Sequence, residues 1–382
     1  MRKHNTDVET QALMGAWPDG RGRAAPGKLR KAGLFGAAMI VLAMCAGGVH
    51  AAGPATQPPA PLGVFGADMP GAGKWVISLS PSVVRNQSSQ IGTTAVSPDD
   101  IVSNIVSGYT PIGSHLLRMV PDHVAIDSVA IGAAYGVSSN VTLTASTALL
   151  WKRLDMEAYK GLSGLAVLGY SDGRTSGIGD TSVAAIVRVF HNADSRVNFN
   201  LGFSLPTGST TATQILLLPN NTAPAKRAFY AMQPGSGTFD LLAGAVYSGV
   251  RGAWSWGASY RARIPLGYSV EGWRYGALHE INGWAGYSMR PGLEATLRLN
   301  GSTQGAVSGR DLVVTGFAQG ADPLFYGGRQ IGIFGGLIVA GKYFGVKAAQ
   351  LGLEGGAPLY QNLNGPQLAR DYQLTMTLKY KL

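Results

Sequence analysis

The sequence predicts an all-β fold: an antiparallel, up-and-down transmembrane β-barrel of about 12 strands, with short periplasmic turns and long extracellular loops. Three observations predict it. Apolar and polar residues alternate in successive segments, the connections between segments are alternately short and long, and Trp and Tyr gather at one end of the segments. Such strands must close into a barrel in a membrane, because hydrocarbon leaves an open sheet edge without hydrogen-bond partners.

The alternation has a period of two, which places one set of side chains on each face of a strand. In the stretch from Ser195 to Ser209, for example, Phe199 and Leu201 alternate with Asn198 and Asn200. Most segments have about 11 to 14 residues, close to the length of a tilted strand that crosses a bilayer. Their spans are 74–85, 123–135, 141–153, 178–191, 195–206, 238–248, 254–264, 278–289, 293–300, 328–339, 346–357 and 371–382.

The connections between these segments fall into two classes that alternate without exception. Turns of about three to six residues, such as NAD at 192–194 and RPG at 290–292, follow every second segment, and longer connections follow the others. Outer-membrane barrels have tight turns in the periplasm and long loops outside. The spacing therefore predicts an antiparallel meander whose loops are sorted to one end.

Aromatic residues indicate which face of the strands meets lipid. The amphipathic side chains of Trp and Tyr collect at membrane interfaces. Those on the apolar faces at the short-turn end are Trp75, Tyr135, Tyr247, Trp254, Tyr287 and Tyr380. We therefore expect the apolar faces to contact lipid and the polar faces to line a wet lumen.

The N-terminal region has the order of a secretory leader. The basic stretch GKLRK ends at Lys31, an uncharged run follows to Val49, and Val49-His50-Ala51 suits cleavage after Ala51. Residues 1–51 are thus predicted to be a signal peptide for export to the outer membrane. An inner-membrane anchor is the alternative, and Met14 competes with Met1 as the start.

The rest of the chain is predicted to form one barrel domain over residues 71–382. A Pro- and Ala-rich stretch, residues 52–70, precedes it and is expected to be a flexible mature N-terminus. Cys45 is the single cysteine, so a disulfide framework and a thiolate metal site are excluded. The leader holds 7 of the 31 basic and 3 of the 21 acidic residues, which leaves 24 against 18. This modest excess predicts no nucleic-acid partner.

Five stretches resemble one known family, the outer-membrane transporters associated with the meta-pathway of phenol degradation. They are SGIGDTSVAAIVRVF (176–190), NFNLGFSLPTGS (198–209), GSGTFDLLAGAVYSG (235–249), WSWGASY (254–260) and YQNLNGPQL (360–368). The resemblance covers most of residues 70–382. It implies a barrel with a transport role, and it brings no catalytic or cofactor-binding residues.

Two patterns that could carry chemistry are interpreted as structural. GYSDG at 169–173 matches a G-x-S-x-G nucleophile motif, but GRTSGIGD after it is a poor helix start, so a loop tip is expected. The histidines of the mature chain have no metal-ligand spacing; they are His115, His123, His191 and His279. The sequence therefore predicts no catalytic residue, no metal site and no cofactor.

The candidate functional residues lie on the inward faces of the predicted strands. They are Arg188, Arg196, Asn198, Asn200, Arg261, Arg263, Glu280, Glu294, Arg298, Glu354 and Lys379, with Lys381 at the chain end. Basic groups outnumber acidic ones, which predicts a mild preference for anions, because fixed charge sets which ions enter a narrow pore. Interior charges can equally pair with one another and hold the barrel's shape.

The leading functional hypothesis is an outer-membrane channel or transporter for small solutes, aromatic or anionic, and not an enzyme. The partners expected are the lipid bilayer, the solute and the barrel-assembly machinery. Two alternatives stay open at this point: a lipase-like outer-membrane enzyme, and a structural barrel with a plugged lumen.

Overall fold

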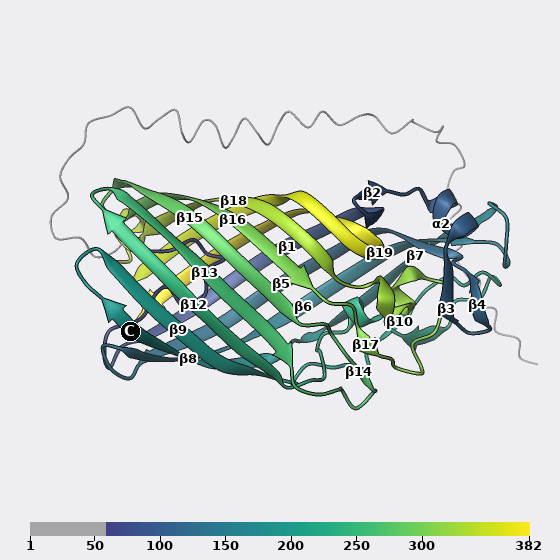
Figure 1. The fold of residues 1–382 in the computed structure, drawn as a ribbon, viewed down its shortest axis with the longest axis horizontal. Helices are drawn as coiled ribbons and strands as arrows, with labels where there is room; N and C mark the ends of the chain where they lie inside the picture. Colours follow the sequence, from purple (N-terminus) through teal and green to yellow (C-terminus); the bar gives the residue numbers. More distant parts are fainter. Residues whose placement is uncertain (1–58) are drawn as a thin grey trace, which may run out of the picture. The chain divides into compact units, whose positions relative to one another are not determined.

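The computed structural model describes residues 59–382, so the predicted signal peptide and the first residues of the predicted flexible segment lie outside the described residues. Thirteen strands belong to one antiparallel sheet, which closes because β19 pairs with both β18 and β1. Figure 1 shows the tilted strands of this wall. No helix within residues 59–382 is long and apolar enough to cross a membrane.

Eleven strands form the closed ring, because β2 (Thr94–Ala95) and β7 (Val167–Ile178) lie off it. The all-β barrel predicted from the sequence is confirmed. The ring strands are β1 (Trp75–Gly92), β5 (Met119–Gly136), β6 (Val141–Tyr159), β8 (Thr181–His191), β9 (Ser195–Leu205), β12 (Asp240–Arg251), β13 (Trp254–Pro265), β15 (Leu278–Arg290), β16 (Leu293–Gln304), β18 (Gly328–Ala340) and β19 (Ala349–Lys381).

Strand β19 contains two passes through the wall. Its residues 350–363 pair with β18, and its residues 363–381 pair with β1. β18 and β1 cross the wall in opposite directions, and β19 is antiparallel to both. The chain of β19 therefore reverses its direction near Leu363. The eleven strands thus make twelve passes, in line with the predicted number.

The region between β6 and β8 differs from its prediction. The sequence suggested a long loop there with Ser171 at its tip, but β6 runs on to Tyr159 and β7 returns beside it, with Ser171 inside β7. The chain then passes from β7 into β8 through Gly179 and Asp180. Alternation failed as a signal because charged side chains such as Arg153 occupy the outer face of this part of the sheet.

The outer face is apolar and the inner face polar, as the alternation predicts. In β9, Phe199 and Leu201 have 52% and 59% of their surface exposed, whereas Asn198 and Asn200 have 1% and 7%. Aromatic residues pair across strands at the short-turn end: the ring centroids of Trp75 and Tyr135 are 4.7 Å apart. An apolar outer face with such a belt indicates a barrel embedded in a membrane.

The long loops carry short elements, and Figure 1 shows them at the end of the strands opposite the C-terminus. Helix α2 begins after Ser97, whose hydroxyl caps it by accepting a hydrogen bond from the Asp100 amide (3.1 Å). The loop elements are α2 (Pro98–Asn104), β3 (Val106–Thr110), β4 (Gly113–Leu116), β10 (Thr213–Ile215), β11 (Ala225–Arg227), η1 (Tyr230–Met232), β14 (Trp273–Arg274), β17 (Ser308–Gly309), η2 (Gln319–Ala321) and η3 (Pro323–Phe325). At the other end, η4 (Gly341–Phe344) forms part of a turn.

Candidate functional site

Residues 59–70, which we call the luminal segment, lie inside the barrel. Ala60, Val64 and Ala67 are buried against Val246 of β12 and Trp284 of β15, both of which point inward. The segment reaches into the lumen and returns to the short-turn end, where β1 begins at Trp75. An apolar patch on the inner wall thus receives a stretch of the chain's own small apolar residues.

Polar contacts also hold the luminal segment. The Asn198 amide donates hydrogen bonds to the carbonyl oxygens of Gly66 (2.8 Å) and Ala67 (3.3 Å). Gly66 has a φ of 86°, a left-handed conformation that favours glycine. A Cβ atom on Gly63 would lie 2.3 Å from the guanidinium of Arg298, so a larger residue here would displace that guanidinium.

Asp68 connects the luminal segment to two distant parts of the wall. Its carboxylate lies 3.0 Å from the Lys379 ammonium and 3.6 Å from the Arg196 guanidinium. Arg196 is on β9 and Lys379 on the second pass of β19, on opposite sides of the ring. Enclosure within the barrel opposes ionisation of Asp68, but these two cations outweigh it and hold its pKa below the usual value.

The prediction that residues 52–70 form a flexible segment does not include these contacts. The Pro- and Ala-rich composition indicated a stretch without secondary structure of its own, and residues 59–70 indeed contain no strand or α-helix. Their partners, however, come from strands more than a hundred residues away, such as Asn198 and Lys379. No local pattern reports contacts of that kind.

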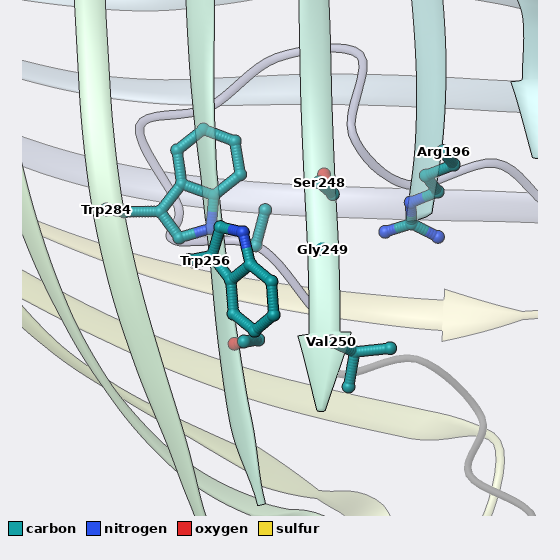
Figure 2. A pocket seen from close by; sticks show the side chains of 8 residues that line it. Arg196, Ser248, Gly249, Val250, Trp256 and Trp284 are labelled. Carbon is teal, nitrogen blue, oxygen red and sulfur yellow. The ribbon is translucent and has the colours of Figure 1, made fainter. Parts of the chain in front are cut away.

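A small pocket lies beside the luminal segment, between Ala60 and the wall residues Arg196, Ser248 and Trp284. Figure 2 shows the strand of Ser248 between those of Arg196 and Trp256, with the strand of Trp284 one further along the wall. The pocket has room for about one water molecule, so it is too small for an organic solute. The Ser248 hydroxyl and the Arg196 Nε have no hydrogen-bond partner among the described residues.

Several predicted lumen residues form ion pairs in the middle of the barrel. Arg298 binds Glu354 through two contacts (2.5 and 3.3 Å), donates to the Asn282 side chain (2.7 Å), and stacks 4.1 Å from the Phe334 ring centroid. This pair is fully buried. Glu294, on the same strand as Arg298, is also buried.

Two further arginines pair nearer the long-loop end. Arg261 lies 2.5 Å from Glu280. Arg263 donates to Asp240 and lies 3.2 Å from Asp180.

The sequence therefore identified the basic groups of the lumen better than their counterions. Asp68, Asp180 and Asp240 were missed because they lie outside the regular part of the alternation, before β1 and at the loop ends of β8 and β12. They neutralise much of the predicted positive excess. Arg188 is different: within residues 59–382 it makes no ion pair, and its register partner on β9 is Asn198.

One side of the lumen is lined by small hydroxyl residues, which we call the hydroxyl wall; they are Ser78, Ser80 and Ser82 of β1 with Thr375 and Thr377 of β19. Ser80 and Thr377 share a hydrogen bond of 2.9 Å, and Ser82 and Thr375 one of 3.0 Å. Ser146 on nearby β6 is exposed to the lumen. Apart from the Asp68–Lys379 contact at the short-turn end of β19, the contacts of the luminal segment described above fall on other parts of the wall, mainly β9, β12, β15 and β16.

The long loops pack together over their end of the barrel and form what we call the lid. Its centre is aromatic: Tyr230 lies 4.9 Å from Trp273 and 5.6 Å from Tyr326, measured between ring centroids. The lid also contacts wall residues, including Met119 and Met156. Burial raises the pKa of Tyr230 to about 12, so this phenol stays protonated.

The groups with possible chemistry are engaged in structural contacts. The Ser171 hydroxyl accepts a hydrogen bond from the Leu217 amide (3.1 Å), His279 is bonded to Tyr260 (2.8 Å), and His123 lies 3.6 Å from Asp155. None of these contacts joins a serine to a histidine. Among the described residues, no group of three His, Cys, Asp or Glu side chains could hold a metal ion.

No protein-family model matches the sequence, and no curated protein matches it significantly. The structure is similar to that of an outer membrane channel from Pseudomonas putida F1, with a TM-score of 0.52, 14% identity, and coverage of 82% of this chain and 97% of that one. The barrel has the fold of an outer-membrane channel.

Weaker structural similarities extend to two other proteins. The Ralstonia pickettii toluene transporter TbuX has a TM-score of 0.38, 13% identity, and coverage of 81% of this chain and 89% of that one. The β domain of the Bordetella autotransporter BrkA has a TM-score of 0.40, 8% identity, and coverage of 81% and 100%. At these identities the likeness concerns the fold alone.

Proposed function

We propose that this chain is an outer-membrane channel that passes small solutes along the hydroxyl wall. The observation that carries the proposal is the contrast between the two sides of the lumen. One side is filled by the luminal segment and by the Arg298–Glu354 pair, whereas the other presents small, partly exposed hydroxyl side chains such as Ser80. If the interior side chains served only to fill the barrel, they would be packed on both sides of the lumen.

The chemistry of this path suits small solutes with a polar group. Hydroxyl side chains donate and accept hydrogen bonds, so they solvate both neutral and charged groups. The resemblance of the sequence to transporters linked to phenol degradation favours aromatic compounds. Arg188, which makes no ion pair within residues 59–382, favours anionic ones. Aromatic carboxylates combine both properties, and we propose them as the solute class.

Export and membrane insertion complete the proposal. The chain would be released from its signal peptide after Ala51, inserted by the barrel-assembly machinery, and surrounded by outer-membrane lipid. N-terminal sequencing of outer-membrane fractions tests this part: a protein that begins at Ala52 is expected, and a retained Met1 or Met14 in the inner membrane contradicts it.

A substitution that narrows the path tests the channel itself. Ser80→Trp places an indole on the lumen face of β1, whereas Leu79→Trp places the same group on the lipid face one residue earlier. We expect Ser80→Trp to lower the single-channel conductance of the purified protein in planar bilayers roughly twofold or more, and Leu79→Trp to leave it unchanged.

The second candidate function is a structural barrel without conduction. The observation that favours it is that both ends are occupied, one by the luminal segment and the other by the lid. Folded wild-type protein that fails to conduct in the same bilayers would support this candidate and reject the channel.

A further inference from the structure

Three cations of the inner wall lie near the short-turn end, and one carboxylate serves two of them. Arg196 and Lys379 both contact Asp68, as described above. Arg188 lies on β8, next to the strand of Arg196, and its positive charge acts on Arg196. Within residues 59–382, Arg188 has no carboxylate of its own. The group therefore holds more positive charge than Asp68 can neutralise.

We propose that Arg188, Arg196 and Lys379 form a binding site for a small carboxylate, and that Asp68 occupies this site until a solute carboxylate displaces it. The inference rests on the proposed channel function and adds a solute site to it. In this arrangement the luminal segment is a tethered competitor, and the solute that enters the site releases it.

The donors at the site suit a carboxylate. Guanidinium groups bind carboxylates through paired N–H donors, and an ammonium adds a compact positive charge. The Nε atoms of Arg188 and Arg196 and the Ser248 hydroxyl have no hydrogen-bond partner among the described residues. These free groups let the site accept a second oxygen that Asp68 does not supply.

The contact made by Asp68 has the character of an exchangeable ion pair. Its side chain is 39% exposed, and the longer of its two contacts is 3.6 Å. Partly exposed ion pairs contribute little free energy, so a solute carboxylate can replace Asp68 in this contact. By contrast, Arg298 and Glu354 are buried and joined by two contacts, so that pair is a fixed part of the wall.

Tethering makes Asp68 an effective competitor in spite of this weak pair. A group held on a short chain acts at millimolar or higher effective concentration. Solute then binds only the fraction of molecules in which Asp68 has left the site, which weakens its apparent affinity by that fraction. Removal of the Asp68 charge is therefore expected to tighten solute binding and to free the luminal segment together.

Thiol labelling reports the release of the segment independently of conduction. Ala60→Cys is introduced into the full chain with Cys45→Ser, so that it carries the only thiol. Ala60 is buried beside the small pocket, which has space for a sulfur atom and none for a bulky maleimide. We expect benzoate at constant ionic strength to speed labelling, and the neutral analogue benzamide to leave the rate unchanged.

The same measurement with Asp68→Asn is expected to show labelling about tenfold faster without benzoate, if the closed form outnumbers the open one about tenfold. The matched control is Asp172→Asn, which removes an acid paired with Arg174 on β7, outside the lumen. A labelling rate that benzoate and Asp68→Asn both leave unchanged would overturn the proposal and make the segment a fixed filling.

A conductance measurement distinguishes rejection of the carboxylate site from rejection of the proposed channel function. A protein that conducts but shows no benzoate-dependent labelling retains the channel and rejects the displaceable carboxylate. A protein that shows benzoate-dependent labelling without conduction retains the site and rejects the channel. If Asp68→Asn does not fold, Lys379→Gln replaces it, and the same acceleration of labelling is expected.

Discussion

The Asp68 carboxylate lies 3.0 Å from the Lys379 ammonium, although 311 residues separate them in the sequence. This contact joins the segment that precedes the first strand to the final strand of the ring. The same two regions also close the barrel, because β1 pairs with β19. Closure of the sheet and occupation of the lumen are therefore coupled at one place in the molecule.

The first prediction concerns the pH range in which the luminal segment stays in place. The pKa of Asp68 is lowered from its usual 3.8, so its ion pairs contribute fully above that value and are lost as the pH falls through the lowered one. Labelling of Ala60→Cys is expected to be pH-independent from about pH 5 to about pH 8, after correction for thiol ionisation, and to accelerate in stronger acid. A dithiodipyridine reagent, which reacts with thiols in acid, checks both ranges.

The other charged groups near Asp68 set the control for this measurement. The cations that contact Asp68 are Arg196 and Lys379, and Arg188 lies on the strand next to Arg196. Glu294 acts electrostatically on Asp68 from the inner face of β16, so the titration is repeated with Glu294→Gln. Release of the segment near neutral pH in both proteins would contradict the role of Asp68.

The second prediction tests the assignment of the two faces. Leu201→Arg places a charge on the lipid face, where it costs about 2–4 kcal/mol at the bilayer midplane. Ser146→Arg places the same group on the lumen face of β6, where the side chain meets water. We expect the first variant to assemble poorly and the second to assemble like wild type, measured by heat-modifiable migration of the folded barrel. Equal assembly of both would show that the faces are assigned wrongly.

Alternation predicted the wall well because hydrocarbon imposes it. A lipid-facing position such as Leu201 must be apolar, so the pattern persists wherever the strand lies in the membrane. Beyond the hydrocarbon that constraint ends, and the prediction failed at the same point: the upper part of β6 and the middle of β7 carry charges such as Arg153 and Asp172 on their outer face. The alternation therefore indicates which part of the sheet lies in the membrane, and it does not indicate how far the strands extend beyond it.

The lumen was less predictable because its inner face obeys no single rule. Trp284 and Val246 point inward and are apolar, since they meet the luminal segment and not water. Charged residues could be assigned to the interior, but their partners could not, because Asp68 reaches Lys379 only after the barrel closes. In the sequence, the Ser and Thr residues of the hydroxyl wall do not differ from other polar residues of the alternating pattern.

The third prediction concerns the lid. Trp273 is buried and packs on Tyr230 and Tyr275, with ring centroids 4.9 and 5.1 Å away. Truncation of a buried Trp to Ala removes about 3–5 kcal/mol of packing, so Trp273→Ala is expected to loosen the loops and to raise conductance. Trp254→Ala removes the same ring from the lipid face and leaves the lid intact. Unchanged conductance in Trp273→Ala would show that the lid does not limit passage.

The fourth prediction separates two ion pairs of the lumen by their burial. Glu354 and Arg298 are both buried, so Glu354→Gln leaves an uncompensated guanidinium in a dry site and is expected to cost about 3–5 kcal/mol of unfolding free energy. Glu280 pairs with Arg261, whose side chain is 47% exposed, so Glu280→Gln is expected to cost about 0–1 kcal/mol. Urea unfolding in phospholipid vesicles, followed by tryptophan fluorescence, measures both.

The comparison also bears on what the charges of the lumen are for. A large loss for Glu354→Gln with unchanged ion selectivity would assign the buried pair to the stability of the wall. We expect Glu280→Gln to do the opposite, leaving stability almost unchanged and increasing anion preference, because it frees the positive charge of Arg261 beside an open part of the lumen. Reversal potentials in a salt gradient measure that preference. Similar stability losses for the two variants would mean that Glu280 is as dry as Glu354, and that water does not reach this level of the barrel.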